Sequence, residues 1–595
     1  MFKRARNLVQ VNSNQILFKK FRQYLIPTMI TYAALSLNEF VDSMLVSNLL
    51  NSDAMAIVGL GAPLILVMAA LYSLLGSGGS TVYAIAIGRR DHETAGQSLT
   101  CSMLIALIVG VLVLVLGMVF STPLAHLLCH EPRLLEQFTY YMHVLLLSAP
   151  FMIVILTVVS FLPSAGYPGF STAVNVIANV VNIAMDYVYI KVFHMGVYGA
   201  GWATLTGYMV ALIVMLAAVF LKKFRMHISW KIKASFAQTK EVLKLGRPDA
   251  MNQVGLAIQF AVCNRLAAAV AGANGVVALS LCLQSSSLMS IFVGAMIGSA
   301  VPIMSVLHGQ RDYSGEASIM KTSMVGQFIV SVAGMLIFMI FAPQAAALYN
   351  IVDAAQLALA VTAFRIYALM YIPRDAVIVY YRYLKVIGLS QYSTVLSALD
   401  SFAMVVPVVW IMTVIGGVKG LFWGFPVASL LLLIVTVIAN RHYKKASDGK
   451  LSGILLIEND EDAKPVVDST ISENPEDISR IAQNVQEICD ENGFSPRISM
   501  RAALAVEEYA IYMSNKQTQD SYADILVRLA GGNVEIDFRS LGDQFDTNED
   551  SENDIEENVM MLRGVASSIE TDYLLGMNCT RIIIEGGQAA SPAGA

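Results

Sequence analysis

Charged residues are scarce in this sequence of 595 residues. They make up 14% of the chain, against 56% hydrophobic residues, and the mean hydropathy is +0.61. This composition excludes a string of ordinary soluble domains, in which about 25% of residues are charged. We therefore expect a polytopic membrane protein that contacts the lipid bilayer and has no nucleic-acid partner.

Cysteine is equally sparse and shows neither a paired spacing nor that of metal ligands, which argues against a disulfide framework. The six residues are Cys101, Cys129, Cys263, Cys282, Cys489 and Cys579. Most of them fit the role of small apolar packing residues. A cleavable signal peptide is not evident either, because the basic start precedes a full-length apolar span that contains Pro27. We expect this span to be the first transmembrane helix.

Long apolar runs, in contrast, are plentiful and predict about twelve transmembrane helices. They lie near residues 24–48, 54–87, 98–121, 134–163, 170–193, 199–222, 247–271, 275–308, 316–341, 355–386, 392–415 and 418–441. Lys and Arg gather at the N-terminus and in alternate loops, among them GRRD at 88–91 and GQRD at 309–312. The positive-inside rule then places both termini in the cytoplasm, with these loops as solvated anchors.

The two halves of the apolar region repeat. Pro27 and Pro248, Gly88 and Gly309, and Gly196 and Gly417 are each 221 residues apart. GVYGAGWAT at 196–204 recurs as GVKGLFWGF at 417–425. The spacing predicts a parallel duplication of six helices. Bundles of this kind place a cavity between their halves for alternating access.

One apolar segment, residues 171–190, carries a polar stripe. Asn175, Asn179, Asn182 and Asp186 follow at steps of four, three and four residues, so on a helix they share one face. A transmembrane helix with one polar face is expected to border a cavity. For Asn175 and Asn179, hydrogen bonding between packed helices is the alternative.

The first apolar segment carries Asn38, Glu39 and Asp42 at helical spacing. Neither this segment nor 171–190 has a Lys or Arg in its apolar body. Carboxyl groups at that depth need a proton, because desolvation favours their neutral form, or a bound cation such as sodium, held together with Asn oxygens. We therefore expect a cation site between these two helices. The alternative is that Asp42 and Asp186 are structural acids hydrogen-bonded between helices.

The order of several motifs over residues 20–443 resembles the multidrug and toxic compound extrusion (MATE) family. The motifs are IPTMITYAALSLNEFVD at 26–42, VGLGAP and GSGGST in the second span, GYP at 166–168, VNIAMDYVYI at 181–190, GVYGAGWAT at 196–204 and LKLGRPDAMNQ at 243–253. The resemblance to the prokaryotic branch with a first-lobe ion site implies that Asp42, Asn182, Asp186 and Thr204 bind protons or sodium. It also implies that Pro27 lets the first helix bend.

Glu39 departs from that pattern, since relatives commonly carry an amide there, and an extra acid affects how many cations move. Thr204 has an alternative role too, because Thr in membrane helices often bonds its own backbone. The resemblance further implies an antiporter in a bacterial inner membrane, with a monomeric membrane part and no cofactor besides the coupling ion.

The second half carries a different polar set. Its members, which are candidates to line a substrate cavity, are Gln253, Gln259, Arg265, Arg374, Asp375 and Asp400. Charged groups at membrane depth face a cavity or pair with one another. The arginines fit a substrate with an anionic group, or they neutralise Asp375 and Asp400. For Arg374 and Asp375, a structural ion pair is the interpretation that we favour.

After residue 445 the chain becomes polar and acidic. Residues 444–474 are expected to form a linker. Helical periodicity follows at 476–492 and 496–515, then a hairpin about Gly531 and Gly532, a helix near 555–568 and a final strand CTRIIIE. This pattern predicts a cytoplasmic α/β sandwich.

Residues 475–586 resemble the anti-sigma-factor-type histidine-kinase-like ATPases, through ALAVEEYAIYMSN, SLGDQFD and VASSIETDYLLGMNCTRIIIE. The family pattern implies an Asn four residues after Glu508, where Tyr512 stands, and an Asp that meets adenine, where Ser540 stands. The glycine-rich lid is missing from 547–561 as well. The resemblance thus implies a degenerate domain without ATP chemistry, so no enzyme activity is expected.

The sequence predicts a secondary exporter that moves an organic, drug-like or amphiphilic compound in exchange for protons or sodium, with a cytoplasmic regulatory domain that has a protein partner. A membrane sensor and a flippase for lipid-linked substrates are the alternatives. The expected parts are the N-terminus 1–22, the first lobe 23–222, the link 223–246, the second lobe 247–443, the linker 444–474, the ATPase-like domain 475–586 and a tail 587–595.

Overall fold

The computed structural model describes most of the chain. The described ranges are 14–50, 52–129, 131–221, 226–347, 354–460, 462–472, 474–516, 522–545 and 557–586. The predicted tail at 587–595 and most of the segment expected to lack the ATP lid lie outside them. The chain divides into two units. Unit 1 comprises Met1–Gln23, Leu307–Ile319 and Tyr443–Ala595, and unit 2 comprises Tyr24–Val306 and Met320–His442.

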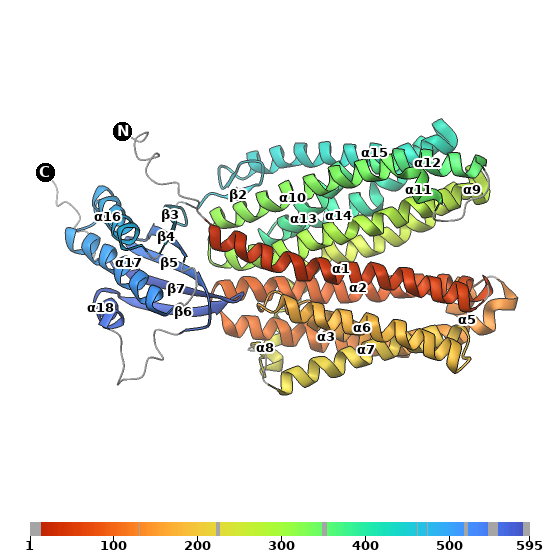
Figure 1. The fold of residues 1–595 in the computed structure, drawn as a ribbon, viewed down its shortest axis with the longest axis horizontal. Helices are drawn as coiled ribbons and strands as arrows, with labels where there is room; N and C mark the ends of the chain where they lie inside the picture. The colour runs from red at the N-terminus through yellow and green to blue at the C-terminus, as the bar shows by residue number, and fades with distance from the viewer. Residues whose placement is uncertain are drawn as a thin grey trace. The chain divides into compact units, whose positions relative to one another are not determined.

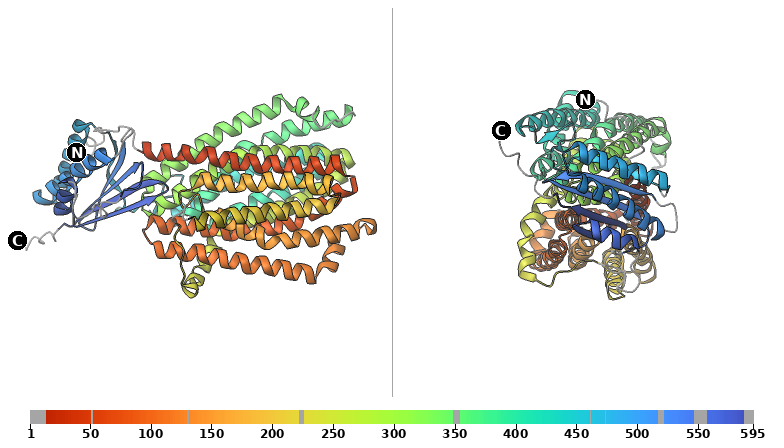
Figure 2. Two further views of the ribbon diagram at one scale, coloured as in Figure 1. Left: turned by 60° about the horizontal axis from the view of Figure 1, so that its bottom comes forward. Right: turned by 90° about the vertical axis from the view of Figure 1, so that its left-hand side faces the viewer.

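Unit 2 is helical, and its long helices run side by side in a bundle (Figures 1 and 2). The elements from its first half are α1 (Gln15–Leu49), α2 (Ser52–Gly88), α3 (His92–Val119), α4 (Ser121–Leu128), α5 (Pro132–Val159), α6 (Pro168–Tyr187), α7 (Val197–Phe220) and α8 (Ile232–Ala237). Those of its second half are α9 (Thr239–Gly309), α10 (Tyr313–Ile340), α11 (Ala342–Ala347), α12 (Ala354–Ala368), α13 (Tyr371–Val386), α14 (Ser390–Ala398) and α15 (Val405–Ala446).

Several of these helices are apolar membrane-type helices. Among the described residues, nine are long and apolar enough to cross a membrane, or ten if the bent pair α12 and α13 counts as one span. The polar α1 is not among them, and Ser390–Ala446 counts once although Gly417 leaves the helical conformation inside it. The twelve spans expected from the sequence therefore stay a prediction.

The backbone repeats with the spacing seen in the sequence. Gly196 (φ 63°, ψ −144°) and Gly417 (φ 57°, ψ −135°) adopt the same left-handed conformation, which favours glycine. Arg90 and Arg311, also 221 residues apart, both have positive φ, at 62° and 57°. Short π-helices also follow α6 (Val188–Val192) and α14 (Leu399–Ala403), but they start 211 residues apart and so do not occupy equivalent positions of the repeat. The duplication is thus visible in local geometry as well as in sequence.

Unit 1 contains an antiparallel sheet of five strands in the order β3-β4-β5-β7-β6. The strands are β3 (Pro465–Ile471), β4 (Ala523–Ala530), β5 (Asn533–Leu541), β6 (Ser568–Leu574) and β7 (Met577–Ile584). Helices α16 (Pro475–Glu491), α17 (Pro496–Lys516) and α18 (Glu557–Val565) cover one face (Figure 1). Val485, Val506, Ile536 and Ile582 lie in the core between helices and sheet. A two-stranded sheet of β1 (Leu451–Ser452) and β2 (Ile457–Glu458) precedes it.

The predicted helices at 476–492 and 496–515 correspond to α16 and α17, and the predicted hairpin is β4 and β5, with Gly531 and Gly532 at positive φ in its turn. Residues 465–471, which the sequence assigned to a linker, form the edge strand β3 instead. The strand was not predicted because the residues around it are acidic and include proline, which is typical of a linker. β6 was missed as well, because SIETDYL has too few apolar residues to show a strand pattern.

Candidate functional site

The polar stripe of α6 is turned into unit 2. Asn182 and Asp186 are buried, at 9% and 0% exposure, and Asn175 and Asn179 are half-buried. Asn182 lies at a close approach of α6 and α7, since a side-chain carbon at Gly207 would lie 3.2 Å from the Asn182 Cβ. The predicted stripe therefore faces neighbouring helices.

Asp186 on α6 meets Asp42 on α1. Their carboxyl groups interact directly with each other, and both act on the Tyr141 hydroxyl on α5. Among the described residues, neither oxygen of Asp186 has a hydrogen-bond donor, and neither acid forms a salt bridge. Two facing carboxylates repel each other unless a proton or a cation lies between them. The structure thus brings together the two acids that the sequence paired.

Tyr141 is the residue of this cluster that sequence reasoning missed. It is 3% exposed, and its ring lies against Gly61 of α2 and Gly201 of α7. A tyrosine in an apolar run gives no periodic signal, because it is common in helix packing as well as in polar sites. Only the positions of α1, α5 and α6 place its hydroxyl near the acids.

Pro27 on α1 is connected to α6. The Thr172 hydroxyl donates a hydrogen bond to the Pro27 carbonyl at 2.8 Å, and the Thr31 hydroxyl donates to the Thr172 oxygen at 2.9 Å. A proline inside a helix removes one backbone hydrogen bond and is a common place for a bend. The proline of α1 is therefore in contact with the helix that carries Asp186.

Other predicted site residues take more ordinary roles in this structure. The Thr204 hydroxyl donates to the Ala200 carbonyl of its own helix at 3.0 Å, and the Asn175 amide donates to the Ser171 carbonyl at 2.9 Å. Glu39 is exposed on α1. The hydrogen bonds of Thr204 and Asn175 are thus made within their own helices, and the role of these two residues and of Glu39 in a cation site stays a prediction.

In the second half, Arg374 on α13 pairs with Asp400, at 3.2 Å between Nε and Oδ1. Asp375 instead accepts hydrogen bonds from Ser331 at 2.7 Å and Gln327 at 3.4 Å. The favoured pairing of Arg374 with Asp375 is therefore wrong: successive residues point to different sides of a helix. Arg374 neutralises Asp400. Its guanidinium is therefore not free to bind an anionic group of a substrate.

The remaining candidates of the second half differ in exposure. Arg265 is exposed on α9, Gln253 is half-buried, and Gln259 is buried with an unpaired Oε1 among the described residues. They stay predictions as substrate-cavity residues.

Comparison with known proteins identifies the fold. The MatE family description matches residues 27–188, which include both acids. A multidrug export protein MepA from Staphylococcus saprophyticus is 22% identical over 432 residues, 71% of this chain and 94% of that protein. An outward-facing multidrug resistance MATE transporter of the MOP superfamily superposes with a TM-score of 0.68 at 23% identity, over 72% of this chain and 96% of that one.

The chain has the fold of a MATE transporter. A second MATE-like structure, described as a MOP superfamily transporter from Pyrococcus furiosus with a binding pocket of reversed polarity, superposes with a TM-score of 0.67 at 23% identity, over 72% of this chain and 96% of that one.

Within this MATE fold, a buried polar cluster joins the two halves. The Lys385 ammonium on α13 donates to Ser77 of α2 at 2.5 Å and to Asp249 of α9 at 2.8 Å. Arg382 also pairs with Asp249. The sequence counted Arg382 and Lys385 only among the basic residues on the cytoplasmic side, whereas Lys385 is buried here. Their shared partner Asp249 and Ser77 were not predicted, because these residues follow no shared pattern along the chain. They connect the halves close to the points where α2 and α9 touch.

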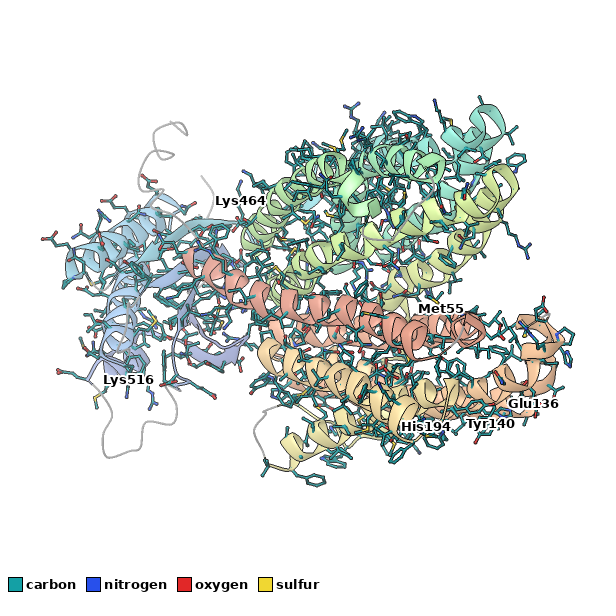
Figure 3. All side chains as sticks on the ribbon, turned by 45° about the vertical axis from the view of Figure 1, so that its right-hand side comes forward. Met55, Glu136, Tyr140, His194, Lys464 and Lys516 are labelled. Atoms are coloured by element: carbon teal, nitrogen blue, oxygen red, sulfur yellow. The ribbon has the colours of Figure 1, made fainter. Side chains whose placement is uncertain are left out.

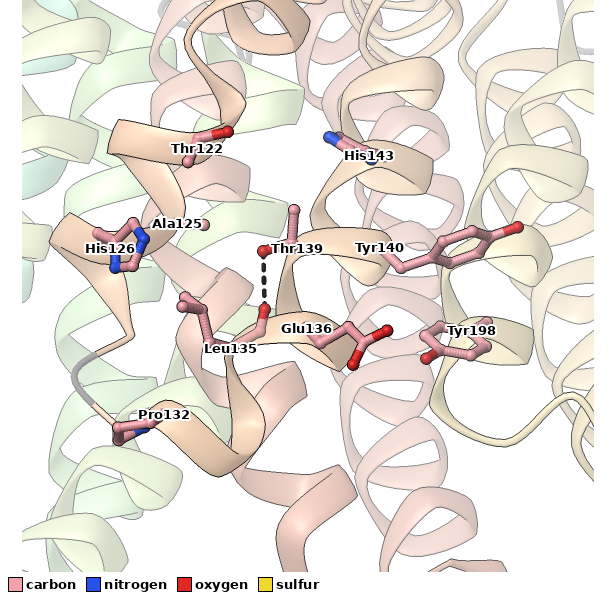
Figure 4. A pocket seen from close by; sticks show the side chains of 10 residues that line it. All are labelled: Thr122, Ala125, His126, Pro132, Leu135, Glu136, Thr139, Tyr140, His143 and Tyr198. Carbon is pink, nitrogen blue, oxygen red and sulfur yellow. Dashed lines mark hydrogen bonds between the residues drawn. The ribbon is translucent and has the colours of Figure 1, made fainter.

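A pocket of about 470 Å³ opens elsewhere, between α4, α5 and α7 (Figure 4). His126, Glu136, His143, Tyr140 and Tyr198 line it, and the rings of Tyr140 and Tyr198 lie 4.6 Å apart. Glu136 and Tyr140 lie near one end of the helical bundle (Figure 3). None of the predicted site residues lines this pocket.

Proposed function

We propose that the protein is a secondary exporter that uses the entry of protons or sodium to drive an organic, drug-like or amphiphilic compound out of the cell. One observation carries the proposal: Asp42 and Asp186 face each other inside a MATE-type bundle, with no basic partner among the described residues. A pair of acids in this arrangement needs a positive species to relieve its repulsion.

The coupling follows from where the acids sit. A cation that binds between them draws α1 and α6 together, and its loss lets the carboxylates separate. Thr172 of α6 donates to the Pro27 carbonyl. A displacement of α6 is therefore transmitted to the proline of α1, where a backbone hydrogen bond is missing. A change in the bend at Pro27 then biases the bundle between its two states. A ligand shifts such an equilibrium only by its difference in affinity for the states.

Both cations fit the residues present. A proton needs only the two carboxyl groups. Sodium needs several oxygen ligands, and the candidates are Asp42, Asp186 and the Asn182 amide oxygen, with Asn175, Asn179, Glu39 and Thr204 as the further predicted candidates on α6, α1 and α7. Among the described residues, no group of three His, Cys, Asp or Glu is placed to hold a metal, so a sodium site depends on the amide and hydroxyl oxygens.

The substrate class comes from the relatives, which are named as multidrug export proteins or as a probable multidrug resistance protein. We propose twelve spans, a bacterial inner-membrane location, cytoplasmic termini and a monomeric membrane part, on the pattern of basic loops. The C-terminal domain is proposed to regulate transport, without ATP, through a protein partner. A sensor that signals through this domain and a flippase for lipid-linked substrates remain the alternatives.

Flux into proteoliposomes distinguishes these functions. Purified protein is reconstituted with an imposed proton or sodium gradient, and uptake of the organic cation ethidium is followed by fluorescence. We expect uptake with one gradient only, and its loss in Asp186→Asn and Asp42→Asn. Asp53→Asn is the control, because Asp53 of α2 belongs to neither predicted site and forms an ion pair with Arg133 at 2.9 Å. Equal flux in Asp186→Asn and wild type would exclude this coupling mechanism.

The choice of cation is tested without substrate. The thermal stability of wild-type protein is measured against sodium concentration at fixed pH, and against pH without sodium. A bound cation raises the melting temperature by mass action. The dependence should vanish in Asp186→Asn. A sodium effect that survives in this variant would place the ion elsewhere.

A further inference from the structure

The sheet of unit 1 has two faces of opposite chemistry. One face carries the apolar residues that α16, α17 and α18 cover. The alternate positions of β4 and β5 carry Asp524, Arg528, Asp537 and Arg539 on the other face, and these four are buried, at 2–8% exposure. Charged residues are almost never buried unless they are paired. The charged face must therefore have partners of its own.

The loop between α9 and α10 provides the first partners. Arg539 Nη1 forms an ion pair with Asp312 Oδ2 at 2.6 Å, and Arg539 Nη2 donates to Gln310 Oε1 at 3.0 Å. Arg528 Nη1 donates to the Gln310 carbonyl at 3.1 Å. Asp312 is 1% exposed. The expectation that this GQRD loop is a solvated anchor is therefore wrong for Asp312, which is enclosed by the sheet.

The start of α1 provides the second set of partners. The backbone N–H of Ile16 donates to Asp524 at 3.2 Å, and the Thr470 hydroxyl donates to the other Asp524 oxygen at 2.6 Å. The first N–H groups of a helix have no partner within the helix. A carboxylate at that end is stabilising, so the sheet caps α1. Lys20 adds a hydrogen bond to the Gly576 carbonyl at 3.1 Å.

Comparison of the two halves shows that Asp312 makes an ion pair with Arg539 in addition to a helix cap that both halves have. Asp91 and Asp312 occupy equivalent positions, and each accepts a hydrogen bond from the first turn of the next helix, from Thr94 N at 2.9 Å and from Gly315 N at 2.8 Å. Capping thus explains the aspartate in both halves. Asp91 is exposed, however, whereas Asp312 also binds Arg539. Capping alone does not explain why a buried arginine meets the second copy.

Asp312 remains ionised at its contact with Arg539. Burial opposes ionisation of Asp312, but Arg539 and the Gly315 amide hold the pKa of Asp312 below its usual value. A buried ion pair gains little net free energy over an apolar contact, and specificity of docking is a better account of why one is kept. The directed bonds of Arg539 to both Asp312 and Gln310 suit that role, since its guanidinium fork fixes the register of the loop on the sheet.

We propose that the charged face of the sheet is a docking surface for two segments of its own chain, the α9–α10 loop and the start of α1. Through it the C-terminal domain clamps one helix end from each half. Its effect on transport rests on the proposed function: if the halves move relative to each other, the clamp slows the exchange, and its release accelerates flux.

A native cysteine reports docking without any transport measurement. Cys579 on β7 pairs in register with Arg539, shares the charged face and is 3% exposed, whereas Cys489 lies in the core on the opposite face. Full-length protein in detergent is treated with a bulky maleimide, and the labelling of each cysteine is followed by mass spectrometry. Labelling of Cys579 alone reports release of the docked segments, and labelling of both reports unfolding.

The informative variants are Asp312→Asn, which keeps an oxygen for the cap, and Arg539→Gln, which keeps a hydrogen bond to Gln310. Asp91→Asn is the matched control. We expect Cys579 to label at least tenfold faster in both test variants, with Cys489 and Asp91→Asn unchanged. If Cys489 is also labelled in Arg539→Gln, that variant has unfolded, and the test of docking then depends on Asp312→Asn alone. Wild-type labelling rates in Asp312→Asn would overturn the docking surface.

The clamp is tested in the same proteoliposomes as the exporter. Asp312→Asn should raise cation-driven ethidium flux severalfold over Asp91→Asn. Faster labelling of Cys579 with unchanged flux would refute the clamp and leave the docking surface intact. Absence of flux in the wild type would refute the proposed exporter, whereas the labelling result would stand by itself.

Discussion

The Thr172 hydroxyl of α6 lies 2.8 Å from the carbonyl oxygen of Pro27 on α1 and donates a hydrogen bond to it. The carbonyl also accepts from Thr31 at 3.2 Å, one turn further along α1. The helix that carries Asp186 therefore holds the helix that carries Asp42 at its proline. This connection between the acids and the bend leads to the first prediction.

Replacing Thr172 by Val should weaken the coupling between cation and transport. The substitution keeps the shape and removes the hydroxyl, which donates to the Pro27 carbonyl and accepts from Thr31. Each hydrogen bond is worth about 1 kcal/mol, or about a fivefold change in an equilibrium. Cation-driven ethidium flux should change severalfold. Thr413→Val is the control, because the buried Thr413 hydroxyl bonds only the Val409 carbonyl of its own helix at 2.6 Å. Equal effects of the two substitutions would contradict a role for the Thr172 contact.

Arg374→Ala should destabilise the second half strongly. It leaves the Asp400 carboxylate buried at 1% exposure without its ion-pair partner, and such losses cost about 3–5 kcal/mol. Asp375→Asn should cost much less, because the amide oxygen can still accept from Ser331. Thermal unfolding of the two purified variants gives the comparison. Similar melting temperatures would show that Arg374 and Asp400 do not depend on each other.

The part of the candidate site that could be predicted from the sequence is mainly the set of polar residues that recur at helical spacing. Four polar residues at helical spacing were enough to place Asn182 and Asp186 on one buried face, because period and burial are linked in a helix. Tyr141, Ser77 and Lys385 were not predicted, since their roles depend on helices that are distant in the sequence. Asp312 was assigned to a solvated loop for a related reason: its partner, Arg539, lies 227 residues further along the chain.

Gly78→Ala should stop transport by keeping the halves apart. A methyl group at Gly78 of α2 would overlap the Val242 carbonyl of α9, and one at Gly246 of α9 would overlap the Leu74 carbonyl. The added methyl group would then exclude this close contact between α2 and α9, and flux should fall at least tenfold. Gly59→Ala on the same helix is the control, because nothing lies within 4 Å of a methyl group there. Full flux in Gly78→Ala would mean that this close approach is not part of the cycle.

Docking of the C-terminal domain should strengthen in mild acid. Burial raises the pKa of Asp468 and of Asp524 to about 6. Asp468 faces Ser314, Asp312 and Arg539, and Asp524 faces Thr470 and the Ile16 N–H. A carboxyl whose pKa is raised by docking binds a proton more tightly when docked.

The contribution of these two groups to docking is therefore fully present below their ordinary pKa of 3.8 and is lost as the pH rises through about 6. Asp312 stays charged above pH 4, because its pKa is lowered, and adds no slope in that range. Cys579 should label more slowly at pH 5 than at pH 7, after division by the rate for an unstructured cysteine peptide. The double variant Asp468→Asn and Asp524→Asn should lose this dependence. A slope of opposite sign would contradict the assignment.

Tyr141→Phe should alter cation coupling although it changes a single hydroxyl. Tyr141 faces both Asp42 and Asp186. Removal of its hydroxyl takes a polar group from beside the acids, which disfavours the ionised state of the pair. The cation concentration for half-maximal flux should therefore shift severalfold, with the maximal rate less affected. Tyr140→Phe is the matched control, because Tyr140 is exposed and lines the separate pocket beside Tyr198. A shift of the same size in Tyr140→Phe would assign the effect to the surroundings of α5 in general and remove Tyr141 from the site.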